Sequence, residues 1–203
     1  MTASRPRIAV FLDRDGTLNH DSGYVRTLED FSVFPESGPA LAQLNQAGLL
    51  VIVVTNQSGI ARGFFSYEDL SRIHEKLRLE MKVHGAWIDD IFVCPHHPDD
   101  GCRCRKPQTG MLEEASRRHN LDLKRSYMIG DKVLDMQVAN RVGAKGLLVL
   151  SGPVSQEAVH SSMSGDGKAH FVADGIKGAV DWILQDMAEP VAKPSVGVEE
   201  LNG

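Results

Sequence analysis

Two aspartates follow directly on a short apolar run near the start of the chain. Residues 8–12 are all apolar and too few for an amphipathic helix, so they predict a strand that is buried on both faces. Asp13 and Asp15 come at its end. As long as the chain stays extended, these two side chains point to one side and Arg14 points to the other. Two neighbouring carboxylates repel each other and therefore require a cation or a shared proton. The pattern indicates a reactive or metal-binding site, against the simpler interpretation of a polar strand end.

Two later apolar runs also end in polar residues. Residues 49–54 lead into Thr55 and Asn56, and residues 126–129 lead into Gly130 and Asp131. The carboxyl ends of parallel strands meet at one edge of a sheet, so these side chains are expected in one crevice with the first aspartates. The sequence Arg-Lys-Pro at 105–107 adds two cations just before a helix. Acidic metal ligands, a hydroxyl and a lysine together suit a phosphoryl group.

Strand and helix patterns alternate along the chain, which predicts a parallel sheet with right-handed crossovers. The spacing of Ser66 and Asp69 predicts a capping box at the start of one of the helices. The strands are expected at residues 8–12, 49–54, 88–93, 126–129 and 146–150. Helical spacing of apolar residues is found around 40–47, 70–81, 111–115, 136–142 and 176–187.

Four short motifs, in this order, resemble those of the haloacid dehalogenase (HAD) superfamily of phosphatases. They are DRDGT at 13–17, TN at 55–56, the lysine of RKP at 105–107 and GDKVLD at 130–135, and the resemblance covers about residues 8–187. It implies a Rossmann-like α/β fold of three layers, with a central parallel sheet of order 3-2-1-4-5 and no large cap domain. Residues 1–187 are then a single domain. Residues 188–203 lack periodicity and are expected to form a flexible tail.

The resemblance implies a role for each motif residue. Asp13 is the nucleophile that takes the phosphoryl group, and Asp15 protonates the leaving oxygen and then activates water. Mg²⁺ is held by the Asp13 carboxylate, the Asp15 backbone carbonyl and Asp131, while Thr55 and Lys106 bind the phosphoryl oxygens. These roles agree with elementary electrostatics, because an anionic carboxylate that attacks an anionic phosphate needs cations to neutralise the charge.

Asp15 also indicates which reaction of the superfamily to expect. A sugar alkoxide is a poor leaving group that needs a proton, whereas a halide does not. The sequence therefore favours a phosphatase over a dehalogenase. Asp135 stays ambiguous, since it can bond to Lys106 or metal-bound water, or act only as an acid in the first turn of a helix.

All three cysteines of the chain lie between positions 94 and 104, which does not suit a disulfide scaffold. Cys94, His96, Cys102 and Cys104 supply three thiolates and one imidazole, which suit a closed, structural zinc site. His97 is an alternative ligand, but the matching family motif uses His96. Unligated thiols are the simpler alternative.

The cysteine loop and the segment TNQSGIARG at 55–63 narrow the resemblance to one branch of the superfamily. This branch contains heptose 1,7-bisphosphate phosphatases and, with a similar zinc loop, histidinol-phosphate phosphatases. The segment at 58–63 resembles the heptose enzymes more closely, which implies removal of the 7-phosphate in the synthesis of ADP- or GDP-heptose for lipopolysaccharide core. Histidinol phosphate is the alternative substrate. Residues 35–37, Pro-Glu-Ser, depart from the Pro-Gly expected before the first helix, so the resemblance does not predict the conformation of that turn.

Since no inserted segment is long enough for a cap, loops must form the mouth of the site. These are the loop after Asp15, the segment at 58–63 and the zinc loop, which is expected to help select the substrate. Asn56, Arg62, Arg105 and Lys106 are the candidate substrate-binding residues, because guanidinium groups suit bidentate contact with a phosphate. Either arginine can instead simply face solvent.

Composition limits the remaining possibilities. The chain has 203 residues, of which 42% are hydrophobic, with a net charge of −5 and a pI near 5.9. It is long enough for one core, has no apolar run that could span a bilayer, and reaches its first strand too soon for a signal peptide. We therefore expect a cytoplasmic monomer acting on a small phosphorylated sugar, without nucleic-acid or membrane partners. A DNA 3′-phosphatase would need a basic groove, and a non-enzymatic zinc module would not explain the acidic motifs.

Overall fold

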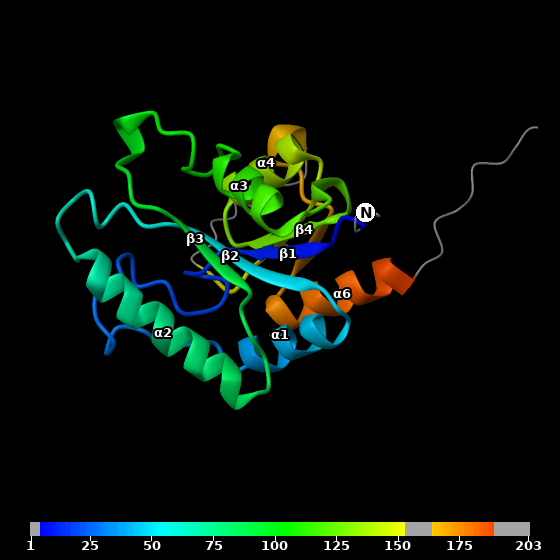
Figure 1. The fold of residues 1–203 in the computed structure, drawn as a ribbon, viewed down its shortest axis with the longest axis horizontal. Helices are drawn as coiled ribbons and strands as arrows, with labels where there is room; N and C mark the ends of the chain where they lie inside the picture. Colours follow the sequence, from blue (N-terminus) through cyan, green and yellow to red (C-terminus); the bar gives the residue numbers. More distant parts are fainter. Residues whose placement is uncertain (1–4, 153–163, 189–203) are drawn as a thin grey trace, which may run out of the picture.

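A computed structural model describes residues 5–152 and 164–188 (Figure 1). Six parallel strands form one sheet in the order β3-β2-β1-β4-β5-β6. The strands are β1 (Ala9–Leu12), β2 (Leu50–Asn56), β3 (Asp90–Cys94), β4 (Tyr127–Gly130), β5 (Lys145–Val149) and β6 (Phe171–Ala173). The expected order of the first five is confirmed, and β6 adds a short edge strand that the sequence analysis missed.

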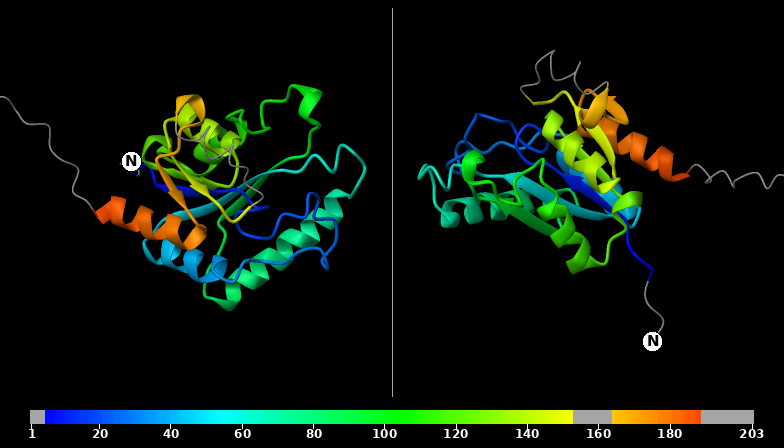
Figure 2. Two further views of the ribbon diagram at one scale, coloured as in Figure 1. Left: turned by 180° about the vertical axis from the view of Figure 1, so that it is seen from behind. Right: turned by 90° about the horizontal axis from the view of Figure 1, so that it is seen from above.

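Helices cover both faces of the sheet, as Figures 1 and 2 show, so the expected three-layer α/β architecture is confirmed. On one face lie α1 (Ser37–Gln46), α2 (Tyr67–Val83) and α6 (Ile176–Ala188), and on the other lie α3 (Gly110–His119) and α4 (Val133–Val142). The predicted capping box at Ser66 and Asp69 is present at the start of α2. Among the described residues, no helix combines the length and apolar character that a membrane crossing needs.

The central strand β1 joins the two hydrophobic cores. Val10 and Leu12 pack into the core under α1, α2 and α6, whereas Ala9 and Phe11 pack into the core under α3 and α4. All four side chains are fully buried. Because alternate residues of a strand face opposite sides, an all-apolar run is what a strand covered on both faces requires. This double burial fixes the strand end that carries Asp13.

The loops after β2 and β3 leave the sheet on the same side in both Figures 1 and 2. Hydrogen bonds tie them together: the Gln57 amide donates to the Cys94 carbonyl at 2.7 Å, and the Ala61 amide donates to the Pro95 carbonyl at 3.3 Å.

The predicted tail lies outside the described residues, except for Ala188, which is the last residue of α6. That residues 1–187 form a single domain stays a prediction.

Candidate active site

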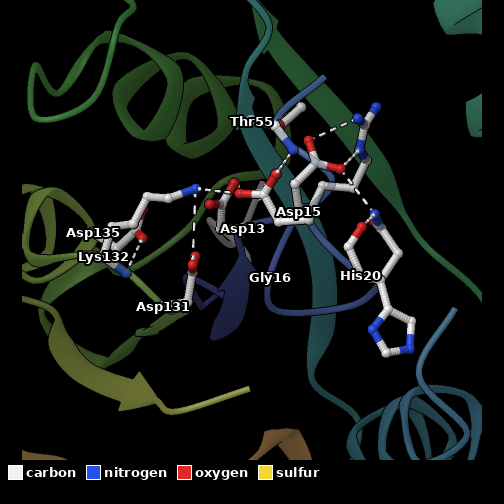
Figure 3. A network of polar contacts seen from close by, with 12 residues as sticks. Asp13, Asp15, Gly16, His20, Thr55, Asp131, Lys132 and Asp135 are labelled. Atoms are coloured by element: carbon white, nitrogen blue, oxygen red, sulfur yellow. Dashed lines mark hydrogen bonds and ion pairs between the residues drawn. The ribbon is translucent and has the colours of Figure 1, made fainter. Parts of the chain in front are cut away.

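The carboxyl ends of β1, β2 and β4 meet at one edge of the sheet, as parallel pairing requires. A pocket of about 260 Å³ opens there. Its lining includes Asp13, Asp15, Thr55, Asn56, Arg105 and Lys106, all of them candidate site residues from the sequence. Figure 3 shows Asp15 on one side of Asp13, with Asp131, Lys132 and Asp135 on the other.

Lys106 is the cation nearest to the expected nucleophile. Its Nζ lies 2.9 Å from Asp13 Oδ1 and 2.6 Å from Asp135 Oδ1, and the side chain is almost fully buried. Burial alone would lower the pKa of Lys106, but the two carboxylates outweigh it and raise the pKa above its usual value. The lysine is therefore a fixed positive charge beside Asp13.

Asn56 positions Lys106 through the backbone. Asn56 Oδ1 accepts from the Lys106 amide at 3.0 Å, and Asn56 Nδ2 donates to the Lys106 carbonyl at 3.2 Å. Asn56 was expected to bind substrate, and it lines the pocket, yet both ends of its amide contact the protein. The structure thus gives this side chain a role in holding the lysine loop against β2.

Asp135 combines two of the roles that the sequence left open: it pairs with Lys106, and it acts as an acid in the first turn of a helix. One carboxylate oxygen pairs with Lys106, and the other accepts from the Lys132 amide at 3.1 Å in the first turn of α4. The side chain is fully buried, and this burial raises its pKa to about 6 although Lys106 opposes the shift. Asp135 therefore joins the start of α4 to the buried lysine.

The carboxylate of Asp15 is held by nitrogen donors from three side chains. Arg14 contacts it through Nε at 3.0 Å and a terminal nitrogen at 2.7 Å, Asn19 donates at 2.9 Å, and Gln57 donates at 2.8 Å. Burial alone would raise the pKa of Asp15, but the Arg14 charge and these hydrogen bonds lower it below its usual value. His74 lies 3.3 Å from the fully buried Arg14, and burial lowers its pKa to about 3, so His74 is neutral.

Asp131 is a buried carboxylate without a hydrogen-bond partner. It is 1% exposed, and neither carboxylate oxygen receives a hydrogen bond from a described residue. The nearest ammonium, Lys132, is 3.8 Å away. Burial and the neighbouring Asp13 charge raise the pKa of Asp131 to about 8. Ligand oxygens of Asp13, Asp131 and Asp135 lie within 4.8 Å of one another, which is the arrangement a divalent cation would satisfy.

The cysteine loop gathers a second group of ligand atoms. Sulfur atoms of Cys94 and Cys102 are 3.6 Å apart, those of Cys102 and Cys104 are 3.5 Å apart, and His96 Nδ1 is 3.2 Å from Cys104 Sγ. Ligands around a tetrahedral zinc with bonds of about 2.0–2.3 Å lie at comparable separations. His97 is outside this cluster, and its ring accepts from the Asp99 amide instead.

The two candidate arginines differ in their surroundings. Arg105 lines the pocket, and one of its terminal nitrogens is buried without a hydrogen-bond partner among the described residues. Arg62 is exposed and does not line this pocket. The structure therefore brings Arg105, and not Arg62, to the rest of the site.

Sequence reasoning missed several polar residues at the site. Lys132 lines the pocket and pairs with Asp21 at 3.1 Å, which ties the loop after β1 to the start of α4. Gln57 contacts Thr55 Oγ1 at 2.9 Å as well as Asp15. Gln57 follows Thr55 by two residues, the same alternation that singled out the first two aspartates, so that spacing was an available signal.

Comparison with known proteins agrees with the motif resemblance. Residues 103–179 match the HAD-hydrolase-like family. The D-glycero-beta-D-manno-heptose-1,7-bisphosphate 7-phosphatase of Yersinia pestis is 39% identical over 198 residues, which cover 93% of this chain and 95% of that protein. The protein of that name from Photorhabdus laumondii is 44% identical over 159 residues, covering 74% of this chain and 85% of its own length.

A solved structure gives the same answer for the fold. The crystal structure of D,D-heptose 1,7-bisphosphate phosphatase from B. bronchiseptica, complexed with magnesium and phosphate, is similar with a TM-score of 0.81 and 36% sequence identity. The match covers 88% of this chain and 99% of that one. With near full-length similarity in both sequence and fold, the chain belongs to the D,D-heptose 1,7-bisphosphate phosphatase family of HAD-like hydrolases.

Proposed function

We propose that this protein is a Mg²⁺-dependent phosphatase that removes the 7-phosphate of D-glycero-D-manno-heptose 1,7-bisphosphate through an aspartyl-phosphate intermediate. The observation that carries the proposal is the buried trio of Asp13, Lys106 and Asp131 at the carboxyl edge of the sheet. A nucleophile, a fixed cation and an unpartnered acid are thereby placed together. Family membership supplies the substrate, since the relatives above carry that activity in their names.

The acidic residues fit a magnesium ion. Asp131 has two buried oxygens that receive no hydrogen bond from any described residue, and a carboxylate in that state needs a cation to offset its burial. Asp13, Asp131 and the backbone carbonyl of Asp15 are the proposed ligands. When bound, Mg²⁺ neutralises charge on the phosphoryl oxygens and on the attacking carboxylate.

The chain's own residues divide the reaction between them. Asp13 attacks phosphorus and breaks its bond to the leaving oxygen, while Lys106 and the Thr55 hydroxyl bind the phosphoryl oxygens. Asp15, which is ionised before the substrate arrives, takes up one proton as the substrate binds and gives that proton to the leaving oxygen. It then takes a proton from the water that attacks the phosphorus of phospho-Asp13, which releases inorganic phosphate and restores both aspartates.

The second phosphate of the substrate is assigned to the arginines. Arg105 offers at the pocket a buried guanidinium nitrogen that has no hydrogen-bond partner in the described part of the chain, and an anion would satisfy it. Arg62 is proposed to reach the substrate only from outside the pocket, since its side chain is exposed. Lys106 completes the proposed substrate-binding set, and Asn56 contributes to it by holding the Lys106 backbone in place.

We assign the cysteine cluster to structural zinc. Three sulfurs and one ring nitrogen within 4.8 Å fill a tetrahedral shell, which leaves no position for water or substrate. We further propose a cytoplasmic monomer that supplies nucleotide-activated heptose for lipopolysaccharide core. A net charge of −5 argues against a nucleic-acid partner.

The substrate assignment is tested with a panel of kcat/KM values in the presence of Mg²⁺. The panel contains heptose 1,7-bisphosphate, heptose 7-phosphate, histidinol phosphate and a DNA 3′-phosphate. We expect the bisphosphate to exceed the monophosphate by about 10-fold or more, since a charge-assisted contact contributes about 1.5–3 kcal/mol. A higher value for histidinol phosphate would move the protein to the neighbouring branch.

Replacing Gly16 by alanine is expected to impair metal binding. Gly16 has a φ of +85°, and a Cβ there would overlap Asp131 Oδ2, so the carboxylate must move. We expect the Mg²⁺ concentration for half-maximal activity to rise about 10-fold or more, as one displaced ligand costs over ~1.4 kcal/mol. Titration of activity with Mg²⁺ measures this.

Gly85→Ala is the matched control for Gly16→Ala. Gly85 has a φ of +69°, and no atom of residues 5–152 or 164–188 lies within 4 Å of the position that its Cβ would take. Both changes cost roughly 1 kcal/mol in backbone strain, but only one touches the acidic residues. Equal Mg²⁺ requirements in the two variants would contradict the placement of the metal at Asp131.

A further inference from the structure

Gln57 bridges two catalytic groups that come from different strands. It follows directly on β2, and its side chain is 5% exposed at the pocket. Its amide nitrogen lies 2.9 Å from Thr55 Oγ1 and 2.8 Å from Asp15 Oδ2. One NH₂ group therefore contacts the proposed phosphoryl-binding hydroxyl and the proposed acid–base carboxylate at once.

The chemistry of these neighbours fixes the orientation of the amide. The ionised Asp15 carboxylate only accepts hydrogen bonds, so the nitrogen of Gln57, and not its oxygen, must face it. The two hydrogens of the NH₂ group are then shared between Asp15 and Thr55. Thr55 Oγ1 acts as an acceptor in this contact, which leaves its own proton free to be donated elsewhere.

That free proton has a clear destination under the proposed function. Thr55 lines the pocket together with Asp13 and Lys106, where the phosphoryl group is expected. Phosphoryl oxygens only accept hydrogen bonds, so a threonine hydroxyl helps there only as a donor. Gln57 imposes that donor orientation before the substrate arrives.

Gln57 also differs from the other donors to Asp15. Arg14 and Asn19 belong to the same loop as Asp15, whereas Gln57 belongs to the end of β2. Its backbone amide donates to the Cys94 carbonyl at 2.7 Å, which anchors it to the end of β3. The position of the Asp15 carboxylate is thus set partly by the strand end that binds the phosphoryl group.

We propose that Gln57 is a positioning residue that orients the Thr55 hydroxyl toward the phosphoryl group and fixes the position of the Asp15 carboxylate relative to that hydroxyl. This inference rests on the proposed phosphatase function. It predicts two separable defects when the amide is lost: weaker binding of the phosphoryl group through Thr55, and poorer protonation of the leaving group through Asp15.

Inorganic phosphate as a competitive inhibitor tests the first defect. Gln57→Met keeps the length of the side chain without its donors, and we expect the inhibition constant to rise about 3–10-fold. Gln57→Glu offers an acceptor that captures the Thr55 proton, so a rise of about 30-fold or more is expected. Gln46→Glu, at the exposed end of α1, is the control with the same change of charge.

A double-mutant cycle shows whether Gln57 acts through Thr55. In the Thr55→Val background no hydroxyl is left to orient, so Gln57→Met is expected to change the phosphate inhibition constant less than about twofold. Thermal unfolding of each variant identifies any that fail to fold. Since Gln57→Met adds no charge, it keeps the test valid if Gln57→Glu does not fold.

The second defect is measured by comparing leaving groups. Nitrophenolate departs without a proton, whereas a sugar alkoxide needs one. In Gln57→Met the ratio of kcat/KM for the sugar phosphate to that for 4-nitrophenyl phosphate is expected to fall about 10-fold. A side chain with only a structural role would lower both values equally.

The outcomes separate this inference from the function on which it rests. A wild-type protein that hydrolyses neither substrate contradicts the proposed phosphatase function. An active wild type whose Gln57 variants keep the phosphate inhibition constant and the leaving-group ratio within twofold overturns the role of Gln57 alone. The same holds if Gln57→Met weakens phosphate binding equally with and without the Thr55 hydroxyl.

Discussion

Asp13→Asn is expected to abolish turnover while the fold is retained. The amide keeps the shape of the carboxylate but has no anionic oxygen to attack phosphorus, so kcat should fall by at least about 10⁴-fold. The variant also loses a negative charge that lies beside Asp131 and raises its pKa, which offsets part of the lost ion pair with Lys106. We therefore expect a folded protein that still binds phosphate.

Three measurements check this expectation. Steady-state kinetics gives kcat, thermal unfolding reports the fold, and acid quenching during turnover of a labelled substrate traps phosphoenzyme only in the wild type. Asp181→Asn serves as control, because Asp181 pairs with Lys177 on the surface of α6. Phosphoenzyme in Asp13→Asn would show that another residue is the nucleophile.

The second large effect is expected from the double variant Cys102→Ser/Cys104→Ser. Native protein should contain about one zinc per chain, and the variant should contain none, since two of the four ligand atoms are lost. Structural zinc binding contributes about 10 kcal/mol or more in small zinc domains, so the loop should lose its order. Lys106 follows Cys104 by two residues, and we expect activity to fall with the zinc content.

His97→Ala is the matched control for the zinc experiment. His97 neighbours His96 in sequence, but its ring lies outside the ligand cluster. Elemental analysis should therefore find zinc in His97→Ala and reduced zinc in His96→Ala. Native protein without zinc, or zinc retained by the double cysteine variant, would contradict the assignment.

The buried strands were predictable because double burial leaves a simple pattern. Residues 8–12 and 49–54 are continuous apolar runs, and β1 and β2 occupy nearly these positions. Strand β6 has three residues, of which Phe171 is half-buried and Val172 is exposed at the sheet edge, so no comparable run exists there. Short edge strands depend on their neighbour more than on their own sequence.

The site was predictable in part for a related reason. Asp13 and Asp131 each follow a strand and Thr55 lies near the end of β2, and parallel pairing brings such ends together. Arg14 was expected to point away from the two aspartates, but the chain bends after Asp13 and the guanidinium contacts Asp15 from a fully buried position. A local turn of this kind depends on packing against α2, through His74, which the spacing of residues does not reveal.

The cysteine loop meets the end of β2 at two places, one before and one after its exposed tip. Cys94 accepts from the Gln57 amide, and Lys106 is paired with Asn56. The tip between them, which includes Pro98–Asp100, is exposed and contributes none of these contacts. Insertions or deletions at the tip can therefore change the length and charge of this loop without displacing Lys106, so the exposed loop and the bond-breaking chemistry are free to evolve separately.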